Sequence, residues 1–167
     1  LYFYFMNDYR STFAGANGRI AFSSDGAGDL DVYTMDPDGS GIVNSTSAPD
    51  APGFALEPDY SPNGTDIVFR SGRANAGELY TMDADGSRQR RLYSHRGFDG
   101  VPVPSPDGRW IALQRGTFDS TTRDFHWELV VVDTLGGNER VLTANRWSSQ
   151  VPTWKPGGDE LVFYANP

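Results

Sequence analysis

The sequence predicts an all-β fold made of repeated four-stranded antiparallel sheets, and three observations lead to this prediction. One motif recurs four times along the chain, its turns contain the residues that tight reversals require, and some strand segments are apolar on both faces. With 19 glycines and 11 prolines in 167 residues, the composition favours turns over helices. The absence of cysteine excludes disulfides, thiolate metal sites and a cysteine nucleophile.

The recurring motif is anchored on an aliphatic residue in a short strand. These anchors are Ile20, Ile67, Ile111 and Leu161, and they are 47, 44 and 50 residues apart. This period is close to the roughly 40–50 residues of a propeller blade. A β-sandwich would not require one set of turns at a fixed long period. We therefore expect a β-propeller whose blades of four antiparallel strands form a partial ring, or a ring completed by self-association.

Every repeat predicts the same order of strands and turns. The first strand is followed by a turn that reads Ser-Pro-Asn-Gly at 61–64 and Ser-Pro-Asp-Gly at 105–108. Proline presets φ in such a turn and glycine completes the reversal. The later strands are expected at 20–22, 67–69 and 111–113 (second), 30–35, 78–82 and 128–132 (third), and 42–46, 90–93 and 140–143 (fourth). The run of valines at 130–132 is apolar on both faces, which suits a sheet packed between two neighbours.

The repeats divide the chain into five segments. Residues 1–10 form an N-terminal strand or a tag remnant, and residues 151–167 form the first two strands of a fourth blade. Three complete blades lie between them, at 11–56, 57–100 and 101–150. Three ways of finishing the ring stay open: closure within one chain by the aromatic strand at 1–6, closure by a second copy, or further blades encoded by a longer gene.

The second repeat carries the pattern of a known family. It reads Glu-Pro-Asp-Tyr-Ser-Pro-Asn-Gly at 57–64, Ile-Val-Phe at 67–69 and Leu-Tyr-Thr-Met-Asp-Ala-Asp-Gly at 79–86, and the next repeat continues it. Over about residues 11–167 the chain resembles TolB-like β-propeller repeats. Such rings usually have six blades, so the resemblance covers roughly half of one.

The resemblance implies a non-catalytic scaffold that binds a protein or peptide through rim loops or the central channel. It also implies a periplasmic or extracellular location. These repeats occur in enzymes too, so two alternatives remain: a propeller fragment of a larger enzyme of the prolyl-oligopeptidase kind, or a self-assembling structural module.

Charge and hydropathy limit the class of partner. The formal net charge of −8 argues against unaided binding to nucleic acid or to an anionic membrane. The longest apolar run, at 1–6, is too short to cross a bilayer, and no signal peptide is predicted in this chain. We therefore expect a protein or peptide partner and self-association into a homo-oligomer, with no nucleic acid and no membrane insertion.

No catalytic centre is predicted. The chain lacks the Gly-x-Ser-x-Gly elbow of serine hydrolases, and its two histidines, His95 and His126, cannot form a three-histidine zinc site. No cofactor is expected apart from one calcium hypothesis, in which a glycine-rich loop wraps three carboxylates around a cation. Its ligands would be Asp25, Asp29 and Asp31, and the favoured alternative is a solvated loop between strands.

Aromatic residues in the loops between blades are candidates for partner binding. Phe54, Phe98 and Trp147 each lie between a fourth strand and the next first strand, near arginines or acidic residues. This composition is typical of protein-binding surfaces, although packing between adjacent blades is the alternative. The long insertion at 115–127 is open to three interpretations: a binding loop, an interface with another chain or a hairpin extension. The candidate partner-binding residues are Phe54, Glu57, Phe98, Asp99, Phe125, His126, Trp127, Arg146 and Trp147.

Overall fold

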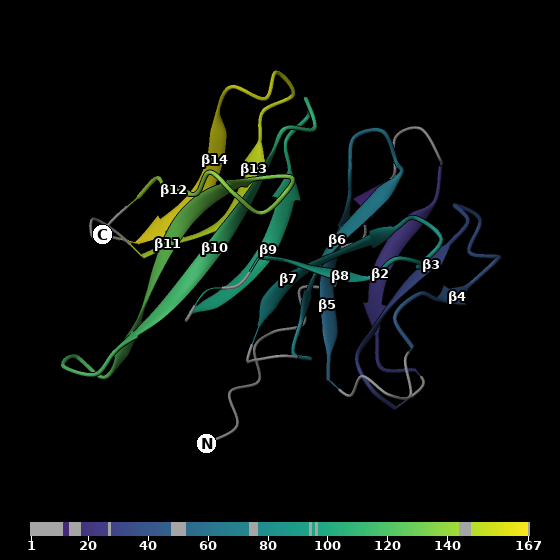
Figure 1. The fold of residues 1–167 in the computed structure, drawn as a ribbon, viewed down its shortest axis with the longest axis horizontal. Coiled ribbons are helices and arrows are strands. Elements are labelled where there is room, and N and C mark those ends of the chain that lie inside the picture. The colour runs from purple at the N-terminus through teal and green to yellow at the C-terminus, as the bar shows by residue number, and fades with distance from the viewer. Residues whose placement is uncertain are drawn as a thin grey trace.

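The computed structural model describes most of the chain, and all regular secondary structure in this part is β (Figure 1). The described residues are 12–13, 18–26, 28–47, 53–73, 77–93, 95, 97–143 and 148–166. None of them belongs to a helix long and apolar enough to cross a membrane. The strand expected at 1–10 lies outside the described residues.

Three four-stranded sheets and one two-stranded sheet follow one another along the chain, and within each sheet consecutive strands are antiparallel neighbours. The first sheet contains β1 (Thr12–Phe13), β2 (Ile20–Ser24), β3 (Asp31–Met35) and β4 (Val43–Asn44). The second contains β5 (Ala55–Tyr60), β6 (Asp66–Ser71), β7 (Glu78–Asp83) and β8 (Arg90–Tyr93). The third contains β9 (Phe98–Pro104), β10 (Trp110–Asp119), β11 (Asp124–Asp133) and β12 (Arg140–Val141). The half-blade contains β13 (Ser148–Trp154) and β14 (Leu161–Asn166).

The all-β prediction of four-stranded antiparallel sheets is confirmed, but several strand limits differ from those expected. β5, β9 and β13 begin at Ala55, Phe98 and Ser148, ahead of the expected blade boundaries at 57, 101 and 151. The fourth strands β4 and β12 are shorter than predicted. Their ladders end early because a threonine hydroxyl replaces the backbone as acceptor: Thr46 Oγ1 accepts from the Val32 N–H at 2.9 Å, and Thr143 Oγ1 accepts from Leu129 N–H at 2.9 Å.

The insertion at 115–127 is a hairpin extension. β10 and β11 stay in register from the blade out to the Asp119–Asp124 pair, so they form a two-stranded ribbon that projects beyond the sheet (Figure 1). Of the three interpretations of the insertion, the hairpin extension therefore describes its conformation.

A left-handed residue recurs at one position of the first strands. Glu57, Val101 and Val151 have φ values of 55°, 50° and 55°, and each lies within a register shift of its strand pair. Such a conformation costs a non-glycine residue about 1–3 kcal/mol. Each of the three N–H groups donates to a side chain of the preceding sheet: Ser23 Oγ at 3.1 Å, Glu57 Oε2 at 2.7 Å and Gln114 Oε1 at 3.1 Å. The strained residue therefore ties one blade to the next.

The hydrophobic core lies between sheets. One cluster joins Ala21 and Val32 of the first sheet to the buried residues Ala55, Tyr60, Ile67, Phe69 and Met82 of the second. Another joins Val68, Leu79 and Leu92 of the second sheet to Ile111, Leu113, Val130 and Val132 of the third. The second sheet is thus buried on both faces. Packing of a sheet between neighbours explains why β6 carries the consecutive apolar residues Ile67, Val68 and Phe69, all of which are buried.

Candidate functional site

An arginine held between two phenylalanines lies where the second and third sheets meet. The guanidinium carbon of Arg70 is 5.0 Å from the ring centroid of Phe54 and 5.2 Å from that of Phe98. Both distances are within the range of a cation–π contact. Arg70 Nη1 also lies 3.4 Å from Glu57 Oε1, and these two side chains are 19% and 17% exposed. Three predicted partner-binding residues, Phe54, Glu57 and Phe98, thus surround one arginine that the sequence analysis did not single out.

The hairpin extension brings more aromatic rings to the same place. Phe98 pairs with Gly116 at the base of the extension, and its ring meets Phe125 edge-on with centroids 6.0 Å apart. Phe125 also contacts Phe118 at 5.4 Å and stacks on Trp127 at 5.9 Å. We call Phe54, Arg70, Phe98, Phe118, Phe125 and Trp127 together the aromatic ledge.

Glycine at position 116 allows the ledge to pack closely. A Cβ on Gly116 would lie 2.8 Å from the ring of Trp127, closer than side-chain atoms approach, so a larger residue would displace the indole. Phe118 and Phe125 remain 55% and 39% exposed at the outer end of the ledge, whereas Phe54, Phe98 and Trp127 are half-buried. The inner rings are therefore held by their packing, and the outer rings are accessible from solvent.

The opposite face of the ribbon is polar. Thr117 pairs with His126 and Asp119 with Asp124, and successive residues of a strand point to opposite faces. These four residues, with Thr122, Phe125 and Glu128, line a hollow of about 720 Å³. The predicted residue His126 therefore lies on the opposite face of β11 from Phe125 and Trp127, although Phe125 also lines the hollow. Its Nε2 atom is buried with no hydrogen-bond partner in the described part of the chain.

A buried ion pair lies behind the ledge. Arg115 Nε donates to Asp99 Oδ1 at 2.9 Å, and these side chains are 3% and 1% exposed. The guanidinium also donates to Tyr93 Oη at 2.6 Å and to Glu139 Oε1 at 2.9 Å. Asp99 Oδ2 has no hydrogen-bond partner among the described residues. Arg115 thus links the second sheet to the third from within the interface.

Burial dominates the electrostatics of this pair. It raises the pKa of Asp99, and the hydrogen bond and charge of Arg115 oppose that rise without cancelling it. Burial, followed by the charge of Arg115, lowers the pKa of the nearby His95. The His95 ring is held in its loop by its own Nδ1, which accepts from the Gly97 N–H at 3.1 Å.

The Asp99–Arg115 pair departs from the repeat. The corresponding cross-strand partners are Ala55 with Ser71 in the second sheet and Ser149 with Ala165 in the half-blade. Sequence reasoning named Asp99 from its loop but missed Arg115 and Tyr93. Alignment of the repeats column by column would have shown a signal, because a charged pair stands in the third blade where the others have small residues.

The calcium hypothesis gains no carboxylate cluster from the structure. Asp31 accepts hydrogen bonds from Asn44 Nδ2 at 2.8 Å and from Thr46 Oγ1 at 3.0 Å, and these bonds attach β3 to the segment that contains β4. Within the described ranges, no group of three or more histidine or acidic side chains could hold a metal ion. The remaining predicted binding residues, Arg146 and Trp147, lie outside the described residues.

Comparisons with known proteins agree with the repeat and the fold. A family model described as a TolB beta propeller domain matches residues 7–167. An uncharacterized protein of Agrobacterium fabrum is 32% identical over 140 residues, which cover 80% of this chain and 46% of that protein. The chain therefore spans under half the length of this curated relative.

Solved structures are similar over nearly the whole chain. A putative TolB from Agrobacterium tumefaciens has a TM-score of 0.77 and 24% identity, covering 97% of this chain and 61% of that one. TolB from Acinetobacter baumannii has a TM-score of 0.70 and 22% identity, covering 93% and 37%. A prolyl endopeptidase structure has a TM-score of 0.61 and 14% identity, covering 90% and 25%. Similarity at these identities concerns the fold alone.

Proposed function

Because the chain belongs to the TolB β-propeller domain family, we propose that it is a non-catalytic propeller scaffold whose aromatic ledge binds a protein or peptide partner. By the same family argument we propose a periplasmic or extracellular location. The observation that carries the proposal is the continuous contact from Phe54 through Arg70 and Phe98 to Phe125.

The composition of the ledge suits a binding surface. Aromatic residues and arginine contribute most of the energy at protein interfaces, and the contribution is largest where they are held in place before binding. Arg70 is restrained between two rings and by Glu57, so it has little side-chain freedom left to lose. Phe118 and Phe125 supply exposed apolar area beside it. A partner that covers both rings would gain hydrophobic burial on a preorganised surface.

Selection of peptides from a displayed random library tests the proposal. Enriched peptides are titrated, by fluorescence anisotropy, against the protein and against Phe125→Ala. We expect the substitution to weaken binding at least tenfold, because alanine removes the ring that contacts Phe98, Phe118 and Trp127.

Leu135→Ala is the matched control, since Leu135 is 81% exposed in the β11–β12 turn, away from the ledge. If the peptides bind both variants as tightly as they bind the unaltered protein, the ledge is not the binding surface. Failure to enrich any peptide would count against a peptide-binding scaffold.

A second candidate function is the propeller part of a larger enzyme. The similarity to a prolyl endopeptidase structure, together with the partial coverage of the curated relative, supports it. A segment with an α/β-hydrolase pattern in the same reading frame would favour this function over the scaffold.

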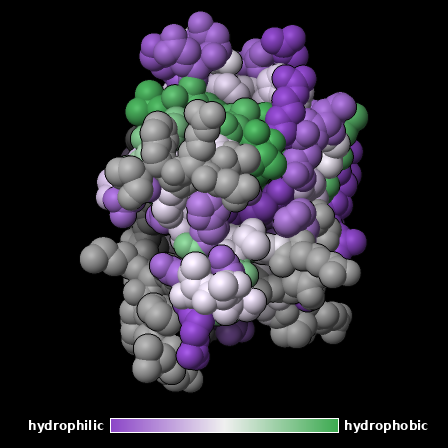
Figure 2. Space-filling model, turned by 90° about the vertical axis from the view of Figure 1, so that its left-hand side faces the viewer, coloured by the Kyte–Doolittle hydropathy of each residue, from purple (hydrophilic) through white to green (hydrophobic). Residues whose placement is uncertain are grey.

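We also propose that the half-blade is a site of self-association. β14 pairs with β13 alone among the described strands, and Val162 and Tyr164 on it are 55% and 64% exposed. Figure 2, which views the molecule from this side, shows hydrophobic residues gathered in the upper part of the face. Light scattering on the purified protein tests this proposal, and a monomer at high concentration would refute it.

A further inference from the structure

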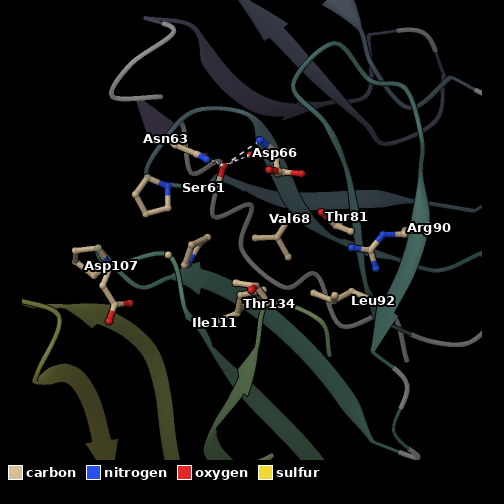
Figure 3. Close-up of a pocket in the computed structure, with 14 residues that line it drawn as sticks. Ser61, Asn63, Asp66, Val68, Thr81, Arg90, Leu92, Asp107, Ile111 and Thr134 are labelled. Carbon is tan, nitrogen blue, oxygen red and sulfur yellow. Dashed lines mark hydrogen bonds between the residues drawn. The ribbon is translucent and has the colours of Figure 1, made fainter. Parts of the chain in front are cut away.

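A pocket of about 610 Å³ lies between the second and third sheets (Figure 3). It is at the opposite ends of the strands from the ledge. Its rim includes both Ser-Pro turns, with Ser61, Pro62 and Asn63 on one side and Pro106, Asp107 and Gly108 on the other. β9 runs from the ledge at Phe98 to the pocket at Pro104, so the two places are separated by the length of a strand.

One wall of the pocket follows from strand register. Val68 pairs with Thr81, and Thr81 pairs with Arg90, so these three side chains form a row across β6, β7 and β8 on one face. Leu92 and, from the third sheet, Ile111 complete an apolar floor with Val68, and all three are buried. The pocket therefore combines an apolar floor with a hydroxyl and a guanidinium side by side.

Arg90 is the uncommitted cation of this pocket. It is exposed, and among the described residues its side chain makes no hydrogen bond and no ion pair. The corresponding arginine of the third blade is Arg140, whose guanidinium carbon lies 4.8 Å above the ring of Trp110. In the second blade the residue that corresponds to Trp110 is Asp66, and it does not pair with Arg90 within the described part of the chain. Figure 3 shows the Arg90 guanidinium close to Thr81 at the edge of the pocket.

The two carboxylates on the rim limit what the pocket accepts. Asp107 is held by Ser105, by the backbone of Arg109 and by the Arg109 side chain, with Arg109 Nε 2.7 Å from Asp107 Oδ2. The Asp66 carboxylate accepts from Thr65 Oγ1 at 2.5 Å. Neither carboxylate is paired with Arg90. Their negative charges therefore repel a phosphate or another multiply charged anion more strongly than they repel a ligand with one carboxylate.

We propose that this pocket binds a monocarboxylate with an apolar body, either a small acid or the C-terminal residue of a peptide. The planar guanidinium of Arg90 presents two parallel donors to a carboxylate, and the Thr81 and Thr134 hydroxyls provide further donors at the pocket. The apolar body rests on Val68, Leu92 and Ile111. This site is independent of the aromatic ledge.

Binding of N-acetyl-leucine, compared with that of its uncharged amide N-acetyl-leucinamide, tests the proposal by NMR titration of the protein. We expect the acid to bind and to change the chemical shifts of the pocket residues, and we expect the amide to bind at least tenfold more weakly. Arg90→Gln should weaken the acid at least tenfold, because a hydrogen bond to a charged group is lost. Arg140→Gln is the matched control and should leave the affinity unchanged, as should Phe125→Ala at the ledge.

Two further probes distinguish the sources of the carboxylate. If the natural ligand is a chain terminus, a tetrapeptide that ends in leucine with a free carboxyl binds more tightly than N-acetyl-leucine, and its amidated form binds more weakly. If the ligand is a small acid, the tetrapeptide binds no better than N-acetyl-leucine. Equal binding of the acid and its amide, unchanged affinity in Arg90→Gln, or no binding at millimolar concentration would each overturn the proposal.

Discussion

Replacement of Arg115 by methionine would remove the charge of the buried pair and keep most of the apolar volume of the side chain. Asp99, which is 1% exposed in the unaltered protein, would lose the cation that pairs with it, and Tyr93 and Glu139 would lose their donor. Breaking a buried pair by removing one partner typically costs about 3–5 kcal/mol, chiefly because the remaining charge is left uncompensated. We expect the free energy of unfolding at pH 7 to fall by this amount.

The pH dependence of that loss identifies Asp99 as its source. Burial already raises the pKa of Asp99, and removal of Arg115 raises it further. A carboxyl whose pKa is higher in the folded state favours folding below its unfolded pKa of about 3.9, and this contribution is lost as the pH rises through the folded pKa. The difference between Arg115→Met and the unaltered protein should therefore be largest at pH 7 and shrink as the pH falls toward 4.

Urea denaturation at pH 7 and pH 4.5 measures both effects. The double variant Asp99→Ala with Arg115→Met, which removes both charges, should recover more than half of the loss at pH 7. Arg109→Met is the control: Arg109 is 76% exposed, so its loss should stay within about 0.5 kcal/mol. A double variant as unstable as Arg115→Met, or a loss that does not change with pH, would refute the reasoning, because packing rather than charge would then dominate.

Two more predictions concern turns. Gly136→Ala should lower the free energy of unfolding by about 3 kcal/mol or more, because its Cβ would lie 2.0 Å from the Leu92 carbonyl oxygen and its φ is 83°. Gly39 has a similar φ of 85° but open space around it, so Gly39→Ala should cost only about 1–2 kcal/mol. Thermal unfolding of both variants checks this, and equal losses would contradict the steric argument. The Asp107 carboxyl should titrate with a pKa of about 2, because hydrogen bonds from Ser105 and Arg109 stabilise its charged form. The contribution of this carboxylate to stability is therefore present above about pH 4 and is lost as the pH falls through 2, so Asp107→Asn should flatten the acid side of the plot of stability against pH. NMR of the carboxyl carbon measures the pKa, and an ordinary value near 3.8 would contradict the prediction.

The sequence predicted the strands and turns well because that information is local. The Ser-Pro-Asn-Gly and Ser-Pro-Asp-Gly turns specify their own φ angles, and valines at 130–132 indicate a sheet covered on both faces. Strand limits were less accurate, since the capping of β3 by Thr46 and the left-handed Glu57 depend on hydrogen bonds to residues far along the chain. Nothing in the local sequence pattern indicates that Thr46 accepts from β3 or that Glu57 adopts a left-handed conformation.

Candidate residues could be named from composition, but their grouping could not. Phe54, Phe98 and Phe125 were each chosen as loop or insertion aromatics, and the structure places them in one ledge around Arg70, which had not been chosen. Asp99 was chosen for the same surface, yet it lies behind the ledge and pairs with Arg115.

By itself, the sequence determined a propeller of four-stranded blades, because the period and the turn chemistry repeat along the chain and the valines at 130–132 indicate a sheet covered on both faces. Only the tertiary structure decided that Phe98 belongs to the ledge while Asp99 belongs to the buried pair, and that Arg90 is left uncovered where Arg140 is stacked on Trp110. The physical reason is strand register, because a shift of one residue sends a side chain to the opposite face of its sheet. β5, β9 and β13 each contain such a register shift.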